Sequence, residues 1–268
     1  MIVSVFGDVH GNIDLVYKSC RDWQRKHEKK IDLILQVGDL GIFGSEEAID
    51  DTTKKRAEEN PAELNLFNYL KNGNYAELLK GSDDFSTVKA RLVFVDGNHD
   101  DHNYLDSLSE KYNKSRALVP VNEYLLYLRD AIPARIENGS TDISLAGIGG
   151  IDKENRPGQY EKKPKVAFTS DETTQALACE GVDIFLTHMY PVVEDRMTGS
   201  QELTDLVQLI QPKFFFFGHA NKHYELRIGN TQCYGLNRVK HSNMDNLGDG
   251  SMLVLEKKGE KLEVINGA

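Results

Sequence analysis

The chain has 268 residues, of which 40% are hydrophobic, and this length and composition suit a protein with one sizeable core. The formal net charge of −10 and the pI of about 5.3 argue against a broad basic surface for nucleic acid. The three cysteines, Cys20, Cys179 and Cys233, are far apart and form no C-x-x-C pair, which argues against a disulfide framework or a cysteine zinc site.

The same features indicate a cytoplasmic protein. Cysteines without regular spacing are typical of a reducing compartment. The first residues show no basic and apolar signal-peptide pattern. No apolar run reaches the roughly 18 residues that a membrane span needs. We therefore expect a cytoplasmic protein with no membrane partner.

Residues 2–37 predict a βαβ unit. The apolar runs at 2–6 and 32–37 predict two buried strands, and apolar residues spaced by three and four over 13–29 predict an amphipathic helix between them. The two strands are expected to be parallel, with a right-handed crossover.

Residues 41–90 interrupt this rhythm. Residues 41–60 are rich in charge and poor in apolar side chains, whereas Pro61 opens a stronger helical pattern and residues 75–80 predict a shorter helical piece. We expect an inserted helical cap near the rim of a site, where loops on a rigid scaffold often decide substrate choice. Disorder between 45 and 60 is the alternative.

The second half alternates short strands, turns and helices. Strands are predicted at 92–95, 124–128, 134–136, 143–148, 182–186 and 213–217, a hairpin turn at Asn138-Gly139, and a final hairpin at 252–256 and 261–265. Thr169 or Ser170 is expected to cap a helix that ends near Gly181, and a second helix covers 203–210. The basic loop at 152–165 is either a mobile surface loop or a lid that contacts substrate phosphates.

Five of the apolar runs end in Asp, Asn or His, which are ligands of hard or borderline metal ions. In open α/β sheets, ligands bind at the carboxyl ends of strands. The residues at these ends are Asp8, His10, Asp39, Asn98, His188, His219 and Asn221. They supply enough oxygen and nitrogen for two divalent ions, and two ions about 3.5–4 Å apart activate water and stabilise the attacking and leaving oxygens of a phosphoryl transfer.

The motifs behind these residues resemble those of the calcineurin-like metallophosphoesterases. Asp-Val-His-Gly, Gly-Asp, Gly-Asn-His-Asp, Thr-His and Gly-His-Ala-Asn occur in the order of that family over residues 2–221. The resemblance implies an α/β fold, a four-layer α/β/β/α sandwich of two mixed sheets, with the strands at 124–148 and 252–265 in the second sheet. We expect one domain over residues 1–268, with the helical insertion at about 41–90.

The resemblance also implies roles for the strand-end residues. Asp8 and His10 would bind a first metal, Asp39 would bridge both metals, and Asn98, His188 and His219 would complete the second site. His99 would donate a proton to the leaving oxygen, with Asp96 or Asp100 holding its imidazole in place.

One position departs from the family. Gly-His-x-His usually supplies a second histidine to the first metal, and Asn221 stands there. An amide oxygen is a weaker, neutral donor, so we expect a weak first site that prefers a harder ion. His223 is an alternative ligand. Two divalent ions are expected as cofactors, with Mn²⁺ favoured and Fe, Zn or Mg²⁺ as alternatives.

The substrate is predicted to be a phosphate ester. The arginines that protein Ser/Thr phosphatases place after Gly-Asp and before Gly-Asn-His are missing. The stretches at 97–105, 145–151 and 182–191 are similar to RNA lariat debranching enzymes, although these typically carry Cys at the position of Asp8. We expect a phosphodiesterase acting on a nucleotide or on an RNA or DNA end. The alternatives are a phosphomonoesterase like the protein phosphatases and a non-catalytic scaffold with a degraded first metal site.

Overall fold

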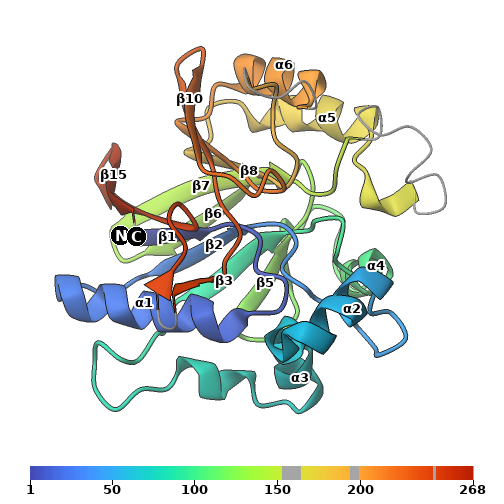
Figure 1. Ribbon diagram of the computed structural model, residues 1–268. Helices are drawn as coiled ribbons and strands as arrows, with labels where there is room; N and C mark the ends of the chain where they lie inside the picture. Colours follow the sequence, from blue (N-terminus) through green and yellow to red (C-terminus); the bar gives the residue numbers. More distant parts are fainter. Residues whose placement is uncertain (153–163, 194–198, 244–245, 268) are drawn as a thin grey trace.

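The computed structural model describes residues 1–152, 164–193, 199–243 and 246–267. Figure 1 shows two stacked β-sheets with helices outside each of them. The first sheet has seven strands in the order β15 (Lys261–Gly267), β14 (Met252–Lys258), β1 (Ile2–Phe6), β2 (Leu33–Val37), β3 (Arg91–Val95), β5 (Leu125–Leu128) and β4 (Leu118–Pro120). The second has six strands in the order β10 (Tyr224–Ile228), β11 (Thr231–Gly235), β9 (Phe214–Phe217), β8 (Ile184–Thr187), β7 (Thr141–Ile148) and β6 (Ala134–Asn138).

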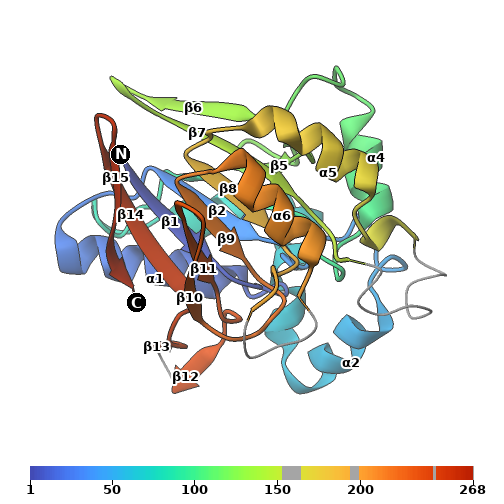
Figure 2. The ribbon, with the colours of Figure 1, turned by 90° about the horizontal axis from the view of Figure 1, so that it is seen from above.

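Helices cover the outer faces of these sheets, and the helix at Asp51–Glu59 lies beyond their edge (Figure 2). They are α1 (Ile13–His27), α2 (Asp51–Glu59), α3 (Asn65–Lys71), α4 (His102–Ser109), α5 (Ser170–Ala176) and α6 (Gln201–Ile210), with short 3₁₀ turns η1 (Pro61–Leu64), η2 (Tyr75–Leu79), η3 (Pro164–Val166) and η4 (Leu177–Cys179). A small ribbon pairs β12 (His241–Asn243) with β13 (Asn246–Leu247). Seen from above in Figure 2, α5 and α6 lie together over the second sheet, while α1 lies on the far side of the first.

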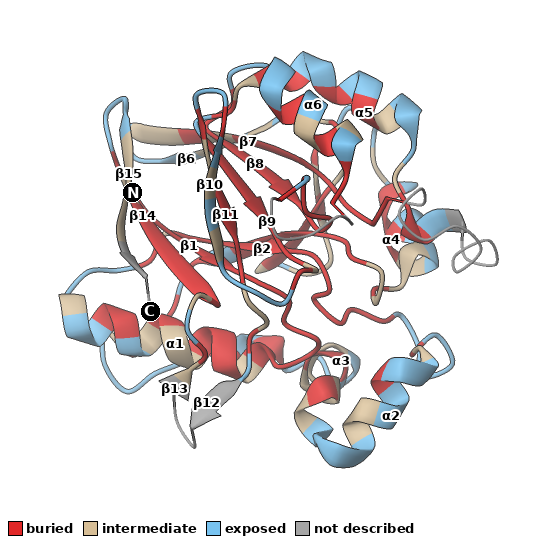
Figure 3. Cartoon of the chain, turned by 45° about the horizontal axis from the view of Figure 1, so that its top comes forward, coloured by how far each residue is buried: buried red, intermediate tan, exposed pale blue. Residues whose placement is uncertain are grey.

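Three apolar layers hold this sandwich together. Because side chains alternate along a strand, Val3 and Val5 of β1 face the second sheet, whereas Ile2 and Phe6 face α1. The third layer joins the second sheet to α5 and α6. Both faces of the central strands are therefore buried, as the red strands of Figure 3 show, and this explains their continuous apolar runs. The predicted four-layer α/β/β/α sandwich is confirmed.

The membership of the second sheet was only partly predicted. β6 and β7 lie there, with the hairpin turn at Asn138-Gly139 as expected. The predictions that placed 124–128 and 252–265 in that sheet are wrong, because β5 pairs with β3 and β14 pairs antiparallel with β1 in the first sheet. In the second sheet, β8 pairs in parallel with β7, and β9 pairs in parallel with β8.

The 41–90 segment, for which a helical cap was expected with disorder between 45 and 60 as the alternative, contains α2, η1, α3 and η2. Residues 45–60 are described in full, and α2 occupies 51–59. Thr53 is the only fully buried residue of α2. Its first turn is fixed instead by Asp50, whose carboxylate accepts hydrogen bonds from the backbone nitrogens of Thr52 and Thr53 at 3.0 and 3.1 Å. The alternative of disorder is therefore wrong.

The topology brings five strand ends together. β1, β2 and β3 are mutually parallel in the first sheet, and β8 and β9 are parallel in the second. Hydrogen bonds between the loops join their exits: the backbone nitrogen of His10 donates to Asp39 at 2.8 Å, and Gly218 donates to His188 at 3.1 Å. The polar residues that follow the strands share one edge of the sandwich.

Candidate metal centre

Two clusters of metal-binding side chains form at this edge and share one carboxylate. Asp8, His10 and Asp39 make one cluster, and Asp39, His188 and His219 make the other, with the ligand atoms of each cluster within 4.8 Å of one another. Asp39 is 2% exposed and Asp8 1%. Buried carboxylates and imidazoles around one shared acid are the donor set of a site for two cations.

The second cluster is arranged around one nitrogen of His188. Its Nδ1 lies 3.0 Å from the carbonyl of Val37, so this nitrogen donates a hydrogen bond, and Nε2 is the nitrogen that could bind a metal. Around that Nε2 lie Asn98 Oδ1 at 3.2 Å, His219 Nδ1 at 3.2 Å and Asp39 Oδ2 at 3.5 Å. Oxygen and nitrogen donors that converge in this way fit a divalent metal.

The first cluster lies on the other side of Asp39. His10 Nε2 is 3.6 Å from Asp39 Oδ2. Asp8 Oδ1 accepts a hydrogen bond of 3.0 Å from the backbone nitrogen of His219, which fixes that carboxylate against the loop after β9. Both clusters are thereby held by main-chain contacts between neighbouring strand exits.

The electrostatics of the two buried acids, Asp8 and Asp39, favour a cation beside them. Burial raises the pKa of Asp8 to about 6, and the charge of Asp39 adds to this rise. Burial would also raise the pKa of Asp39, but His188 and His10 hold it well below its usual value. Two buried acids this close cannot both ionise cheaply without a cation, and a metal ion would supply that charge.

Backbone strain is concentrated at the same residues. Seven non-glycine residues of the described chain have positive φ, and four of them are His10 at 44°, Asp39 at 53°, His219 at 58° and Asn221 at 51°. Such conformations cost about 1–3 kcal/mol each and cluster at functional sites. The fold holds these side chains in place against their local preference.

Asn221 lies at the margin of the site. It is exposed, and its amide nitrogen lies 3.3 Å from the carbonyl of His219. His223, the alternative ligand, is also exposed and packs its ring against Gly250, in the turn before β14. The other six predicted metal ligands lie together in the two clusters. Asn221 and His223 lie outside both.

His99 is held by a carboxylate that the sequence did not suggest. Its Nδ1 lies 3.2 Å from Oδ1 of Asp50, the residue that caps α2. Its backbone nitrogen donates to Asp39 Oδ1 at 2.7 Å. Burial alone would lower the pKa of His99, but the hydrogen bond to Asp50 and the charge of Asp39 raise it above its usual value.

The prediction that Asp96 or Asp100 holds His99 is wrong. Asp96 pairs instead with His102, Oδ2 to Nδ1 at 3.0 Å, and accepts the hydroxyl of Tyr127 at 3.0 Å. Asp100 accepts backbone nitrogens from Gly41 at 2.8 Å and Gly97 at 2.8 Å. Both acids follow β3 closely, but their carboxylates point into the protein and fasten the loops rather than the imidazole.

Two arginines that sequence reasoning missed also reach the clusters. Arg56 of α2 lies with Nη1 3.5 Å from His10 Nδ1. Arg238, in the loop after β11, forms an ion pair with Glu63, whose side chain is 2% exposed. Neither residue belongs to a motif, so only the fold reveals that they lie beside the site.

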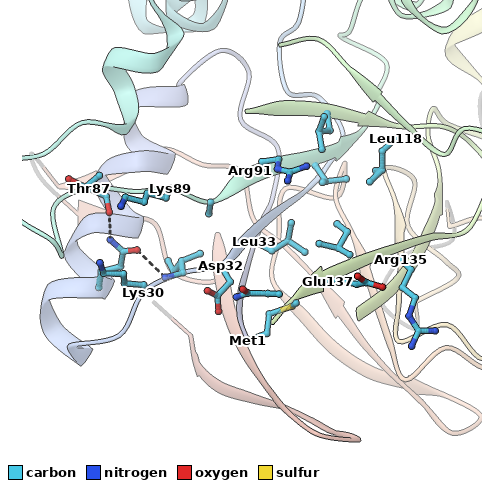
Figure 4. A pocket seen from close by; sticks show the side chains of 17 residues that line it. Met1, Lys30, Asp32, Leu33, Thr87, Lys89, Arg91, Leu118, Arg135 and Glu137 are labelled. Carbon is cyan, nitrogen blue, oxygen red and sulfur yellow. Dashed lines mark hydrogen bonds between the residues drawn. The ribbon is translucent and has the colours of Figure 1, made fainter. Parts of the chain in front are cut away.

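A cavity of about 360 Å³ opens beside His99, and Phe43, Asp50, Asn98 and Lys165 are among its lining residues. A second cavity of about 460 Å³ lies away from the site (Figure 4). Leu33 and Arg91, at the starts of β2 and β3, line it, so it is at the opposite end of the strands from Asp39 and Asn98.

Most of the basic loop predicted at 152–165 lies outside the described residues. Lys165 is described, and its ammonium group pairs with Asp106 of α4. In the part of the chain that is described, no helix is long and apolar enough to span a membrane.

The chain belongs to the calcineurin-like phosphoesterase family, whose sequence profile matches residues 1–222. Among curated proteins it is 24% identical over 253 residues to the lariat debranching enzyme of Arabidopsis thaliana, a match that covers 82% of this chain and 54% of the relative. It is also 24% identical over 259 residues to lariat debranching enzyme A of Xenopus laevis, with 82% and 43% covered. The chain spans about half the length of these relatives.

Solved structures share the fold at low identity. GAP50, described as the anchor in the inner membrane complex of Plasmodium, has a TM-score of 0.57 and 16% identity, with all of this chain and 87% of the other covered. The protein TT1561 of Thermus thermophilus has a TM-score of 0.56 and 13% identity, with 99% and 98% covered. These similarities support the fold alone.

Proposed function

We propose that this protein is a metal-dependent phosphoesterase that hydrolyses a phosphodiester. The observation that carries the proposal is the pair of donor clusters that share Asp39. Family membership supports the same chemistry. Residues 1–268 act as one catalytic domain, to which the 41–90 segment contributes Asp50.

In this proposal Asp8 and His10 would hold one divalent ion, and Asn98, His188 and His219 would hold the other, with Asp39 available to both. Bound ions of this kind supply Lewis acidity toward the phosphoryl oxygens and a nucleophile at neutral pH. Mn²⁺ suits the mixed oxygen and nitrogen donors. Asn221 contributes at most a weak, neutral ligand, so the first ion binds less tightly than the second.

His99 acts as the general acid. A water molecule loses one proton to solvent, and its hydroxide oxygen forms a bond to phosphorus. The bond from phosphorus to the leaving oxygen breaks, His99 gives its proton to that oxygen, and the neutral imidazole then regains a proton from solvent. The raised pKa of His99 supports this role, because the ring must be protonated at the start of the step. Asp50 orients the ring through Nδ1 and leaves Nε2 for the substrate.

The cavity beside His99 indicates which substrates to test. A cavity of about 360 Å³ beside His99 can accept a leaving group of nucleoside size, because small-molecule sites typically measure about 300–1,000 Å³. The relatives named lariat debranching enzymes support a 2′–5′ phosphodiester as the first natural substrate to test. Asp8 stands where those enzymes typically carry Cys, so the protein joins a related scaffold to a different first metal site.

The test is hydrolysis of bis(p-nitrophenyl) phosphate and of p-nitrophenyl phosphate by the protein loaded with Mn²⁺. We expect faster turnover of the diester, and a loss of about 100-fold or more for His99→Ala, since general acid catalysis contributes about 10²–10⁴. Faster turnover of the monoester would favour a phosphomonoesterase.

One observation favours a second candidate, a non-catalytic scaffold. Asn221 gives the first cluster one imidazole fewer than the family pattern, and its amide lies against the backbone of His219. If neither ester is hydrolysed with Mn²⁺, Fe²⁺, Zn²⁺ or Mg²⁺, and His99→Ala equals the wild type, the scaffold is the better description.

A further inference from the structure

Arg56 belongs to α2 in the 41–90 segment, and its side chain reaches the site from there. It follows Asp50 by six residues, less than two helical turns. Asp50 contacts His99, Arg56 contacts His10, and the rings of His99 and His10 lie 5.4 Å apart. The guanidinium of Arg56 is therefore beside both the predicted proton donor and a predicted metal ligand.

Arg238 reaches the same site from the loop after β11, far from Arg56 in the sequence. The backbone nitrogen of Val239, the next residue, donates to the carbonyl of Asp8 at 2.8 Å. Nη2 of Arg238 pairs with Oε1 of Glu63 in η1. A guanidinium has five N–H donors, so this pair fixes the group and leaves donors for a further acceptor.

Both arginines lie close to the loop that carries Asp8 and His10. Arg56 contacts the His10 ring at 3.5 Å, and Arg238 directly precedes Val239, whose backbone nitrogen donates to the carbonyl of Asp8. In a chain with a net charge of −10, two guanidiniums therefore lie at the edge of the first cluster, and Glu63 pairs with one of them. Positive charge at this place would attract an anion.

The contact between Arg56 and His10 is weak enough to be exchanged. At 3.5 Å it lies at the limit of a hydrogen bond. If His10 binds a metal through Nε2, its Nδ1 carries the proton and can no longer accept from Arg56. Metal binding would thus release the guanidinium for another acceptor.

We propose that Arg56 and Arg238 bind the non-bridging oxygens of the substrate phosphoryl group, from positions outside the strand-end motifs. The inference rests on the proposed function, because it assumes that the phosphate meets the metals at this site. Arginine suits the task, since its planar fork binds two phosphate oxygens at once. Recognition would then require the 41–90 segment, because that segment supplies Arg56 directly and holds Arg238 through Glu63.

The experiment compares Arg56→Gln with Lys55→Gln, which removes an exposed cation from the same helix. Binding of Mn²⁺ is measured by calorimetry on each metal-free protein. Binding of inorganic phosphate, also by calorimetry, and kcat/KM on bis(p-nitrophenyl) phosphate are measured on each protein loaded with Mn²⁺. For Arg56→Gln we expect phosphate affinity and kcat/KM to fall about 10-fold to 100-fold, as for the loss of a hydrogen bond between charged groups. Mn²⁺ affinity should be retained, and Lys55→Gln should match the wild type.

Arg238 needs a second variant, because removing it alone would leave Glu63 buried without its partner. The double variant Glu63→Gln with Arg238→Gln avoids that charge, and the same fall in phosphate affinity is expected. If Arg56→Gln binds phosphate as Lys55→Gln does, the inference is wrong. If the wild type binds phosphate through these arginines but hydrolyses neither ester, the proposed function fails while the phosphate site stands.

Discussion

The contact between Asp50 and His99 offers the sharpest test of how the site is built. Asp50→Asn keeps a side chain that caps α2, because Asn and Asp are about equally good at that position. It removes the negative charge that lies 3.2 Å from Nδ1 of His99. The variant therefore separates the positioning of His99 from the stability of the helix.

The size of the effect follows from the contact that is lost. A hydrogen bond to a charged group is worth about 1.5–3 kcal/mol, which corresponds to a fall of about 10-fold to 150-fold in kcat/KM on a phosphodiester. Asp50 and Asp39 raise the pKa of His99 against burial and Arg56. Without the charge of Asp50 this pKa falls, so the protonated ring is lost at lower pH and the alkaline limb of the profile shifts downward.

The matched control is Asp51→Asn, which removes an exposed charge from the first turn of the same helix. It should change neither kcat/KM nor the pH profile. Thermal unfolding should be similar for both variants. If Asp50→Asn has the activity and pH profile of Asp51→Asn, the carboxylate does not position the proton donor.

Three further changes test the site and the fold. Asp39→Ala removes the carboxylate shared by both clusters, so calorimetry should show at most one weakly bound Mn²⁺ and hydrolysis should be lost. Gly38 has a φ of +88°, and an added Cβ would lie 2.6 Å from Cβ of His188, so Gly38→Ala should lower the melting temperature and weaken Mn²⁺ binding; unchanged values would contradict this. Lys213 at 2.8 Å and Lys257 at 2.6 Å stabilise the ionised carboxylate of Asp183 and, against burial, lower its pKa to about 2. Because this pKa is below the unfolded value, the stability is present above about pH 4 and is lost as the pH falls to about 2, and denaturant titration of Asp183→Asn should lack this loss of about 2 kcal/mol.

The residues at the strand ends could be predicted because a short local sequence pattern marks each of them. An apolar run that stops at Asp, Asn or His marks both a buried strand and a polar exit, and parallel strands bring their exits to one edge. Asp39 and His188 were therefore identified before the fold was known, although they lie far apart in sequence. Asp39 also needs a positive φ, which no sequence pattern revealed.

The sheet membership of β14 and β5 could not be predicted in the same way. An apolar run with both faces buried fits any place in either sheet. β14 pairs with β1 because the chain returns to the first sheet after β11, and the two are joined in register from Ile2 opposite Glu256 to Phe6 opposite Met252. Pairing across the length of the chain leaves no trace in a single sequence.

The residues around the predicted ligands were missed for a different reason. Asp50 and Arg56 belong to a helix that buries only Thr53, so it has no apolar stripe from which to predict it. The sequence predicted a cap or disorder here and named neither Asp50 nor Arg56 as part of the site, but both face it. A polar segment that carries function resembles a disordered one when only its composition is considered.

The weak packing of α2 has a consequence for how the site responds to ligands. A helix of nine residues is marginal on its own, and polar contacts join α2 to the site, from its cap Asp50 to His99 and from Arg56 to His10. A ligand that binds better when α2 is folded must stabilise the folded helix. By the same linkage, a change that unfolds α2 must weaken binding of that ligand. If Arg56 binds the substrate phosphate as proposed, folding of the 41–90 segment would be part of substrate binding.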